Sequence, residues 1–409
     1  MGGAALSPRR PWDDRHVVLG VTGGIAAYKV VSLARDLTQL GAVVDVVLTN
    51  AARAFVGAIT FEAVTGRPVR TDILAPGFAL DHIRLAREAD VVCVAPATAH
   101  TLARAAAGAA PDFLSAILLA TRAPVLLCPA MNDRMWAQAR VQANTVRVGE
   151  LGYTLVGPAT GPLAFGEGEG PGRMEEPEVI LEHIGRALAG TTPLTGRRVV
   201  VTAGPTREPI DAVRFVSNRS SGRMGYAIAQ AAWRRGADVT LITGPTALAA
   251  PIGASIVSVE TAEEMKEAVA GALLGADVLV MAAAVADFRP ARVAAGKIKK
   301  ETRPDAIALA PAPDVLRETR AARPPALVAV GFALETDNAR ANARAKLAAK
   351  DLDLVVLNDA TVPGAGFEVE TNQVVLLDRA GGAEELPLLP KDVVAEAILD
   401  RVVTLLPGR

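Results

Sequence analysis

The chain has 409 residues, of which 51% are hydrophobic and only 4% are aromatic. Its 43 Lys and Arg residues and 44 Asp and Glu residues leave a formal net charge of -1. Such a chain is long enough for two or three domains with sizeable cores, and its balanced charge and few aromatic residues argue against a nucleic-acid-binding surface.

The sequence carries no recognisable targeting or membrane signal. Residues 1–14 are charged and lack the apolar stretch of a signal peptide. No run of about 18 uncharged apolar residues occurs in the chain. Cys93 and Cys128 lie in strand-like apolar runs, and two buried thiols suit a reducing compartment better than a disulfide does. We therefore expect a soluble, cytoplasmic protein with neither a membrane nor a nucleic-acid partner.

The first half alternates strand-like runs with helical patterns. Strands are predicted at 16–22, 42–49, 91–95 and 125–129, with a turn and a helix over 23–41. This alternation indicates successive βα units and a doubly wound parallel sheet.

Polar and small residues follow these strands. Gly23 and Gly24 stand at the first strand-to-helix turn, where glycine lets backbone approach a phosphate closely, although a tight turn alone could explain them. Thr49 ends the second strand, Thr98 follows the third, and Asn132 follows the fourth. The carboxyl ends of parallel strands converge on one crevice, so these residues form a candidate site. Asn132 could equally be a helix N-cap.

His82 stands in LDHIRLAREAD, shortly before the third strand. A single histidine is more often structural than catalytic. Its charged neighbours argue against deep burial, so it could titrate near neutral pH and act as a base.

The segments GGIAAYK, DHIRLAREAD, APATAHTLARAAAG and PAMNDRMW together resemble the flavoprotein family of cysteine decarboxylases, represented by phosphopantothenoylcysteine decarboxylase. The resemblance covers about residues 20–185. It implies bound FMN as the electron sink for decarboxylation, His82 as a catalytic base, and Asn132 as the group that grips the substrate carboxylate. The FMN-binding residues it implies are Gly23, Gly24, Ile25, Thr49, Ala97 and Thr98.

The segment 161–174, GPLAFGEGEGPGRM, resembles the substrate flap of that family. Many members have Cys directly after Leu-Ala and use it as a proton donor, whereas this chain has Phe165, which cannot donate a proton. Glu167 is a candidate replacement, with a pKa that closure of the flap would raise. Alternatively, Glu167 and Glu169 only make a Gly-rich loop soluble.

A Gly-, Thr- and Pro-rich segment, 186–198, separates the halves and predicts a domain boundary near residue 192. The predicted domains are 1–192 and 193–409. The βα pattern restarts with a strand at 198–201, so we expect an α/β fold of two doubly wound (Rossmann-like) parallel-sheet domains. The roughly twenty-residue polar loop 202–225 then leads into a helix, far exceeding the about 2–6 residues a plain connection needs. A loop of that length at a helix N-terminus indicates an anion-binding site.

Three later motifs extend this second site. Asp287 follows the predicted strand 278–281, and GKIKK at 296–300 is a basic cluster. Lys346 and Lys350 lie four residues apart in a predicted helix, so both ammonium groups lie on one helix face. Taken alone, such lysines are more often solvated surface residues.

Over about residues 198–405, the chain closely resembles phosphopantothenate–cysteine ligase. The resemblance implies CTP with Mg²⁺, an acyl-cytidylate intermediate, and final attack by the cysteine amine. It places Asn218 at the reacting acyl group, Arg214 on the same loop, and Lys297 at the nucleotide phosphates. The Mg²⁺ ligands are unassigned. The implied CTP-binding residues are Met281, Ala282, Ala283, Asp287, Lys297, Ala312, Pro313, Asp314, Val315, Phe332, Lys346 and Lys350.

The two resemblances together imply a fused enzyme of coenzyme A biosynthesis. The second domain joins 4′-phosphopantothenate to L-cysteine, and the first decarboxylates the product to 4′-phosphopantetheine. They also imply homo-oligomers, with trimeric contacts between N-terminal domains that share flavin sites and dimeric contacts between ligase domains. Alternatives are an active ligase with a structural flavin domain, a flavoprotein of prenyl transfer or oxidoreduction, and a flavin-binding regulatory scaffold.

Overall fold

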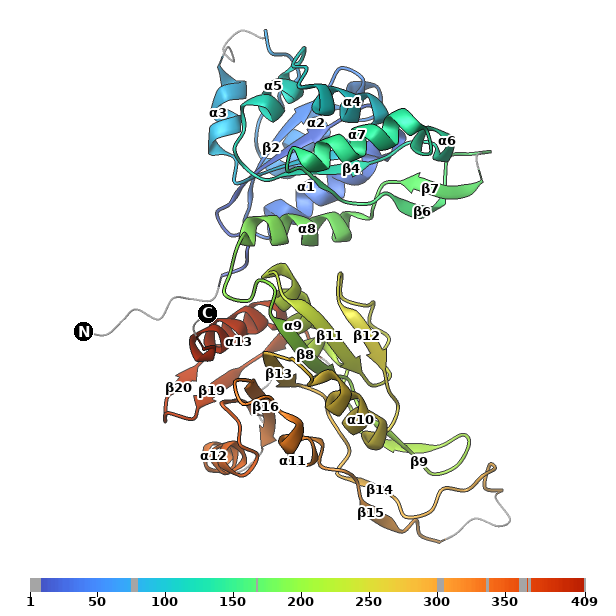
Figure 1. Ribbon diagram of the computed structural model, residues 1–409, viewed down its shortest axis with the longest axis vertical. Coiled ribbons are helices and arrows are strands. Elements are labelled where there is room, and N and C mark those ends of the chain that lie inside the picture. Colours follow the sequence, from blue (N-terminus) through green and yellow to red (C-terminus); the bar gives the residue numbers. More distant parts are fainter. Residues whose placement is uncertain are drawn as a thin grey trace, which may run out of the picture. The chain divides into compact units, whose positions relative to one another are not determined.

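The computed structural model describes residues 9–74, 80–166, 168–299, 305–335, 338–359, 366 and 369–407. They form two compact units, one from Arg10 to Gly190 and one made mainly of the residues from Thr191 on (Figure 1). Within these ranges, no helix is both long and apolar enough to span a membrane.

The first unit contains a five-stranded parallel sheet in the order β2-β1-β3-β4-β5. This is a doubly wound order, with its switch point between β1 and β3. The strands are β1 (His16–Val21), β2 (Val43–Leu48), β3 (Val91–Ala97), β4 (Val125–Pro129) and β5 (Thr154–Leu155). The first four are the strands that the sequence predicts.

Helices cover both faces of this sheet (Figure 1). One face packs against α1 (Lys29–Gln39), α2 (Ala58–Thr65) and α8 (Pro177–Ala189). The other packs against α3 (Asp81–Glu88), α4 (Ala99–Ala107), α5 (Phe113–Ala120) and α7 (Ala139–Glu150). Short elements complete the unit: η1 (Ile25–Tyr28), η2 (Ala52–Ala54), α6 (Asp133–Trp136), and the hairpin of β6 (Ala159–Pro162) and β7 (Glu169–Arg173).

The interpretation of 186–198 as a linker is partly wrong, because α8 continues to Ala189. This amphipathic helix buries Ile180 and Ile184 and ends at Gly190, whose φ of 60° suits glycine. The irregular connection is therefore shorter than its composition indicates.

The second unit contains an eight-stranded sheet in the order β12-β11-β8-β13-β16-β17-β19-β20. The strands are β8 (Arg198–Ala203), β11 (Asp238–Thr243), β12 (Ser255–Ser258), β13 (Val278–Met281), β16 (Val328–Glu335), β17 (Leu354–Asp359), β19 (Val374–Asp378) and β20 (Ala383–Glu385). The first six are parallel and doubly wound, with the switch point between β8 and β13.

The last two strands correct the expectation of a wholly parallel sheet. β19 runs antiparallel to β17, and β20 runs antiparallel to β19. A short turn joins β19 to β20, where Asp378 accepts a hydrogen bond from the backbone of Gly382 at 2.8 Å. So short a connection can only reverse the chain, because a parallel return needs a crossover.

One face of the second sheet packs against α9 (Arg223–Arg234) and α13 (Lys391–Leu405), and the other against α10 (Ala262–Ala272), α11 (Val315–Glu318) and α12 (Ala339–Ala349). Smaller elements are η4 (Arg320–Ala322) and the pairs β9 (Arg207–Pro209) with β10 (Phe215–Ser217), β14 (Phe288–Pro290) with β15 (Leu309–Pro311), and β18 (Thr371–Asn372) with β21 (Leu389–Pro390).

A buried ionic cluster joins α9 to α13. Arg234 and Arg235 each donate to one carboxylate oxygen of Glu396 at 2.8 Å. The side chains of Arg234 and Glu396 are both only 5% exposed. Removing one partner of such a pair costs about 3–5 kcal/mol, since the other charge is left buried and uncompensated.

Candidate active sites

In the first unit, a cavity of about 1210 Å³ lies at the carboxyl ends of β1 to β4. Among the residues that the sequence assigns to a flavin site, its walls include Gly23, Gly24, Ile25, Thr49, Thr98 and Asn132. Four segments far apart in sequence therefore meet at the switch point of the sheet. Ala97, also assigned to FMN, is fully buried at the end of β3 and is not among the described lining residues.

The two glycines of the first turn differ in what surrounds them. A Cβ added at Gly23 would lie 2.3 Å from the Cβ of Ala51, so the loop after β1 touches the loop after β2 there. A Cβ added at Gly24 would meet nothing closer than 3.6 Å. Gly23 is thus required by packing, whereas Gly24 leaves open space beside the cavity.

The polar side chains at the strand ends also organise local backbone. Thr98 caps α4 by accepting from the backbone N–H of Thr101, and Thr49 donates to the carbonyl of Val21 at 3.3 Å. Asn132 caps α6 through Oδ1, which accepts from the backbone of Arg134 at 2.9 Å. Its Nδ2 has no partner among the described residues, so Asn132 can cap the helix and still donate into the cavity it lines.

His82 does not line this cavity within the described residues. It lies on α3 and meets Phe113, a lining residue, edge to face with ring centroids 6.1 Å apart. Its Nδ1 is shielded from solvent and has no hydrogen-bond partner in the described part of the chain. His82 is half-buried, which agrees with the expectation that it is not deeply buried, although its Nδ1 is enclosed. Its charged neighbours pair with one another.

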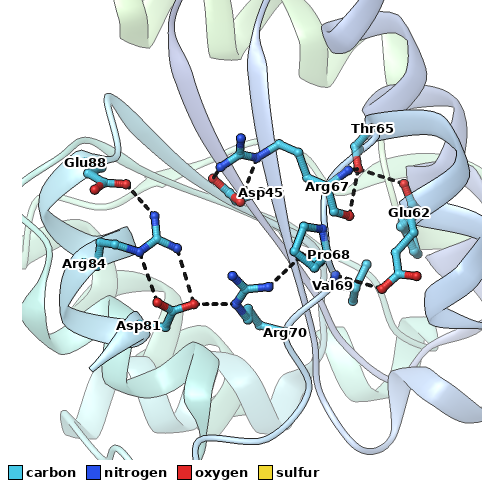
Figure 2. A network of polar contacts seen from close by, with 11 residues as sticks. Asp45, Glu62, Thr65, Arg67, Pro68, Val69, Arg70, Asp81, Arg84 and Glu88 are labelled. Carbon is cyan, nitrogen blue, oxygen red and sulfur yellow. Dashed lines mark hydrogen bonds and ion pairs between the residues drawn. The ribbon is translucent and has the colours of Figure 1, made fainter. Parts of the chain in front are cut away.

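Figure 2 shows that pairing at the start of α3. Asp81 accepts from Arg70 at 2.6 Å and from Arg84 at 3.0 Å, and Arg84 also contacts Glu88. Hydrogen bonding from Arg84 lowers the pKa of Asp81 below its usual value. The ionic network fixes the first turn of α3, and with it the position of His82.

The predicted flap is the β6–β7 hairpin, and its residues Leu163 and Ala164 line the cavity. Phe165 is fully exposed, and Glu167 lies outside the described residues. The base of the hairpin is tied to α1, because Glu176 accepts both from Lys29, at 2.9 and 3.0 Å, and from Arg173. The Lys29 ammonium holds the pKa of Glu176 below its usual range.

Several charged residues of the cavity wall were not predicted from the sequence. Lys29 and Arg173 line it while paired with Glu176, and Arg104 lines it while paired with Asp112. Arg53, on η2, also lines it and has no partner among the described residues. Lys29 and Arg104 lie within the motifs GGIAAYK and APATAHTLAR. Their closeness in sequence to the glycines and threonines of these motifs could have predicted that they line the cavity.

These features fit a flavin. Typical ligand pockets measure about 300–1,000 Å³, so a cavity of about 1210 Å³ can hold a flavin together with a second ligand. It lies at the switch point of a 2-1-3-4-5 sheet, where such folds bind phosphorylated ligands. Ile25, Met131 and Leu163 supply apolar wall for a ring system.

In the second unit, the loop after β8 is joined to the segment after β13. The hydroxyls of Thr202 and Thr206 accept from the backbone of Ala283 and Ala286 at 3.1 and 3.0 Å. The backbone of Ala284 donates to Gly204 at 2.9 Å. The loop predicted at 202–225 is therefore an ordered structure, containing the β9–β10 hairpin, at the switch point of the second sheet.

Asn218 and Arg214, both assigned to catalysis, are held differently. Asn218 Nδ2 donates to the carbonyls of Ala284 and Val285 at 2.9 and 3.2 Å, which leaves its Oδ1 without a partner among the described residues. The Arg214 guanidinium instead binds Asp211 and the carbonyl of Ile298. Asn218 therefore keeps a free acceptor beside the segment that follows β13, whereas the observed contacts of Arg214 are structural.

Lys346 and Lys350 lie on the same side of α12, as predicted from their spacing. Lys346 donates to the carbonyl of Phe332 at 2.6 Å, and Lys350 contacts Asp314. Burial lowers the pKa of both lysines, and the charge of Asp287 opposes that shift in each case. Both ammonium groups therefore lie within electrostatic reach of Asp287.

Of the other residues assigned to CTP, Phe332 and Asp314 contact this pair and Asp287 lies near it. Asp287, after β13, accepts at its carbonyl from the backbone of Ala312 at 2.9 Å, and Asp314 caps α11 just before Val315. Met281 ends β13 and is buried, whereas Ala282, Pro313 and Phe332 are half-buried. Lys297 lies on an exposed segment. Within the described ranges, no cluster of three His, Cys, Asp or Glu residues could hold a metal ion.

Comparison with known proteins identifies both units. The family model described as Flavoprotein matches residues 6–189, and that described as DNA/pantothenate metabolism flavoprotein C-terminal domain matches residues 194–406. The Coenzyme A biosynthesis bifunctional protein CoaBC of Mycobacterium bovis is 47% identical over 96% of this chain and 97% of its own length. Its namesake in Vibrio cholerae is 42% identical, over 94% and 97%. A crystal structure of the C-terminal domain of Coenzyme A biosynthesis bifunctional protein CoaBC is 39% identical and covers 53% of this chain and 98% of its own, with a TM-score of 0.46.

Proposed function

Because this chain belongs to the family of coenzyme A biosynthesis bifunctional proteins, we propose that its two units catalyse consecutive steps, ligation in residues 193–409 and decarboxylation in residues 1–192. The chain is a bifunctional enzyme of coenzyme A biosynthesis, and its first unit is a flavoprotein. The ligase joins 4′-phosphopantothenate to L-cysteine with CTP, and the decarboxylase converts the product to 4′-phosphopantetheine.

One observation carries the proposal: each sheet has a polar site at its own switch point. The first is the cavity of about 1210 Å³, and the second is the group of polar residues that includes Asn218, Asp287 and Lys346. Two such sites on one chain suit two reactions that share an intermediate.

In the first unit, Gly24, Ile25, Thr49 and Thr98 would hold FMN. Bound flavin supplies the electron sink that loss of carbon dioxide requires. Asn132 donates its free Nδ2 hydrogens to the substrate carboxylate and orients it. Leu163 and Ala164 on the flap exclude water from the reacting carbon.

His82 is the proposed base of this unit. Its ring packs edge to face on Phe113, and among the described residues it does not line the cavity of its own unit. The chain assembles as a homo-oligomer with trimeric contacts between first units, so that His82 serves a flavin site shared between copies.

In the second unit, Lys297, Lys346 and Lys350 neutralise the CTP triphosphate, which otherwise repels the attacking carboxylate. Mg²⁺ would enter with the triphosphate and help to neutralise its charge. The Asn218 side chain contacts the reacting acyl group, and the cysteine amine then displaces CMP. Second units associate as dimers.

We place the enzyme in the cytoplasm. Cys93 and Cys128 are free and buried, with their sulfurs 3.8 Å apart. The hydrogen bond with Cys93 and burial raise the pKa of Cys128, which keeps it protonated and inert in a reducing compartment.

The test uses the purified full-length chain. Yellow colour reports flavin, pyrophosphate release from CTP with phosphopantothenate and cysteine reports ligation, and carbon dioxide release reports decarboxylation. Protein that ligates and binds flavin but releases no carbon dioxide would instead support the alternative of a structural first unit.

A further inference from the structure

We propose that Asp211 is a positioning residue of the ligase reaction: with Arg214 it grips the backbone of Ile298 and so fixes Lys297 at the site of the CTP phosphates. The proposal rests on the ligase function proposed above for the second unit. It also reassigns Arg214, whose guanidinium acts through Asp211 and Ile298 and not on the substrate.

Asp211 is the centre of the contact. Its side chain is completely buried. Oδ1 accepts from the backbone N–H groups of Val213 and Arg214, both at 2.8 Å. Oδ2 accepts from Arg214 Nε at 3.0 Å, from Arg214 Nη2, and from the backbone N–H of Ile298 at 3.1 Å. One carboxylate therefore closes its own turn and holds a second segment 87 residues away.

Arg214 completes the grip from the other side. Its Nη2 donates to the carbonyl of Ile298 at 3.0 Å. Both backbone polar groups of Ile298 are thus bound, one by each member of the Asp211–Arg214 pair. The segment is anchored again at Ala294, whose N–H donates to the carbonyl of Ile210 at 3.0 Å.

Lys297 needs such an anchor, because most residues from Ala291 to Lys299 are exposed. Lys297 itself has no partner among the described residues. A long cation on an exposed segment reaches a phosphate only after the segment is ordered, and prior ordering removes that cost from binding and reaction. Ile298 directly follows Lys297, so holding Ile298 orders the backbone of the lysine.

The charges of Asp211 and Arg214 indicate that this pair acts by holding a position and not by changing its protonation state. The Arg214 guanidinium, helped by three backbone N–H groups, holds the pKa of Asp211 far below its usual range. The Asp211 carboxylate therefore stays ionised near neutral pH, and its charge is opposite to that of the Arg214 guanidinium. Because the pair adds no net charge, its contribution is to hold the backbone of Ile298, and with it Lys297, in position.

A double-mutant cycle on the full-length enzyme tests this. CTP-dependent pyrophosphate release is measured for the wild type, Asp211→Asn, Lys297→Ala and the double variant. Asp211→Asn is expected to lower kcat/KM for CTP about 10²-fold, the cost of misplacing a reacting group by about 1 Å. Because the loss acts through Lys297, the double variant should be no worse than Lys297→Ala.

Two further variants separate positioning from folding. Ile298→Pro removes the N–H that Asp211 accepts and also restricts the backbone of Lys297, so it should reproduce the loss. Normal activity in this variant would count against the contact. Asp238→Asn, at an exposed acid at the start of β11, should leave the rate unchanged. Decarboxylation of supplied phosphopantothenoylcysteine should stay normal in all variants.

Full ligase activity in Asp211→Asn, or losses that multiply in the double variant, would overturn the positioning role. If Asp211→Asn fails to fold, normal activity in Ile298→Pro would overturn it as well. A wild type that forms no amide from CTP would instead defeat the proposed function, which separates the two failures.

Discussion

The two sites differ in how the chain builds them. The first is a walled cavity, with Gly23 packed on Ala51 and Phe113 closing one side. The second is built from partly exposed segments that are held by ionic and backbone contacts, such as the hydrogen bond from Ile298 to the Asp211 carboxylate. The first site therefore selects mainly by shape and the second by charge, and substitutions should act accordingly.

The largest expected effect falls on the first site. His82→Ala should abolish most carbon dioxide release while FMN stays bound, a loss of about 10²–10⁴-fold for a missing general base. The measurement is decarboxylation of supplied phosphopantothenoylcysteine, with the flavin spectrum as the folding control. His100→Ala is the matched comparison, because His100 lines the cavity directly. If carbon dioxide release is unchanged in His82→Ala but lost in His100→Ala, the catalytic base is His100 and not His82.

The corresponding change in the second site is Asn218→Ala. It removes the two hydrogen bonds to Ala284 and Val285 together with the free Oδ1. Amide formation should fall about 10²–10³-fold, comparable with deletion of one polar group that stabilises a transition state. Flavin binding and decarboxylation should persist, since both belong to the other unit. Full ligase turnover in this variant would remove Asn218 from the mechanism.

A pair of glycine substitutions sharpens the contrast between packing and binding. Gly23→Ala should destabilise the first unit by about 1–3 kcal/mol, since its Cβ would overlap that of Ala51. Gly24→Ala should leave thermal stability intact, because its new methyl group meets no protein atom closer than 3.6 Å. The same change should weaken flavin binding, because Gly24 lines the cavity.

The control for the first substitution is Gly23→Ala with Ala51→Gly, which should restore part of the stability, because the backbone of residue 51 still lies 3.0 Å from the added Cβ. Equal melting temperatures for Gly23→Ala and Gly24→Ala would show that the contact with Ala51 does not limit the fold.

The smallest expected effect is a shift in pH dependence at the second site. Burial lowers the pKa of Lys346, so its ammonium is lost as pH rises through a value below the usual lysine pKa of about 10.4. KM for CTP should therefore increase on the alkaline side, and Lys346→Arg should delay that increase because arginine stays charged. Lys266→Arg is the control, since hydrogen bonding to Glu263 raises the pKa of Lys266. Identical profiles for wild type and Lys346→Arg would exclude Lys346 as the titrating group.

Local patterns predicted the elements well, because strands such as His16–Val21 and Val278–Met281 are continuous apolar runs followed by small or polar residues. The convergence of Thr49, Thr98 and Asn132 on one cavity followed from the rule that parallel strands share a carboxyl edge. The antiparallel pairing of β19 and β20 was missed, since strand direction depends on a connection whose reversal carries no strong sequence signal.

Pairings between distant charges were the least predictable. Arg214 reads as a free cation in the sequence, yet it folds back on Asp211 and reaches Ile298, 84 residues away. His82 is half-buried, as its charged neighbours indicate, yet Arg70 and Arg84 bind its acidic neighbour Asp81 and its Nδ1 is enclosed. The tertiary structure decides which of many possible partners a charged residue contacts. Residue type and spacing alone therefore do not predict these pairs.

The cluster of Arg234, Arg235 and Glu396 has a consequence for synthesis of the chain on the ribosome. Arg234 is translated 162 residues before Glu396, the carboxylate that neutralises it. The first unit is complete by Gly190 and can fold while translation continues, because domains generally fold as units during synthesis. The second unit must hold two guanidinium groups and the apolar face of α9 open to solvent until α13 emerges. Its nascent form is therefore the stage at which chaperones have the most exposed surface to bind.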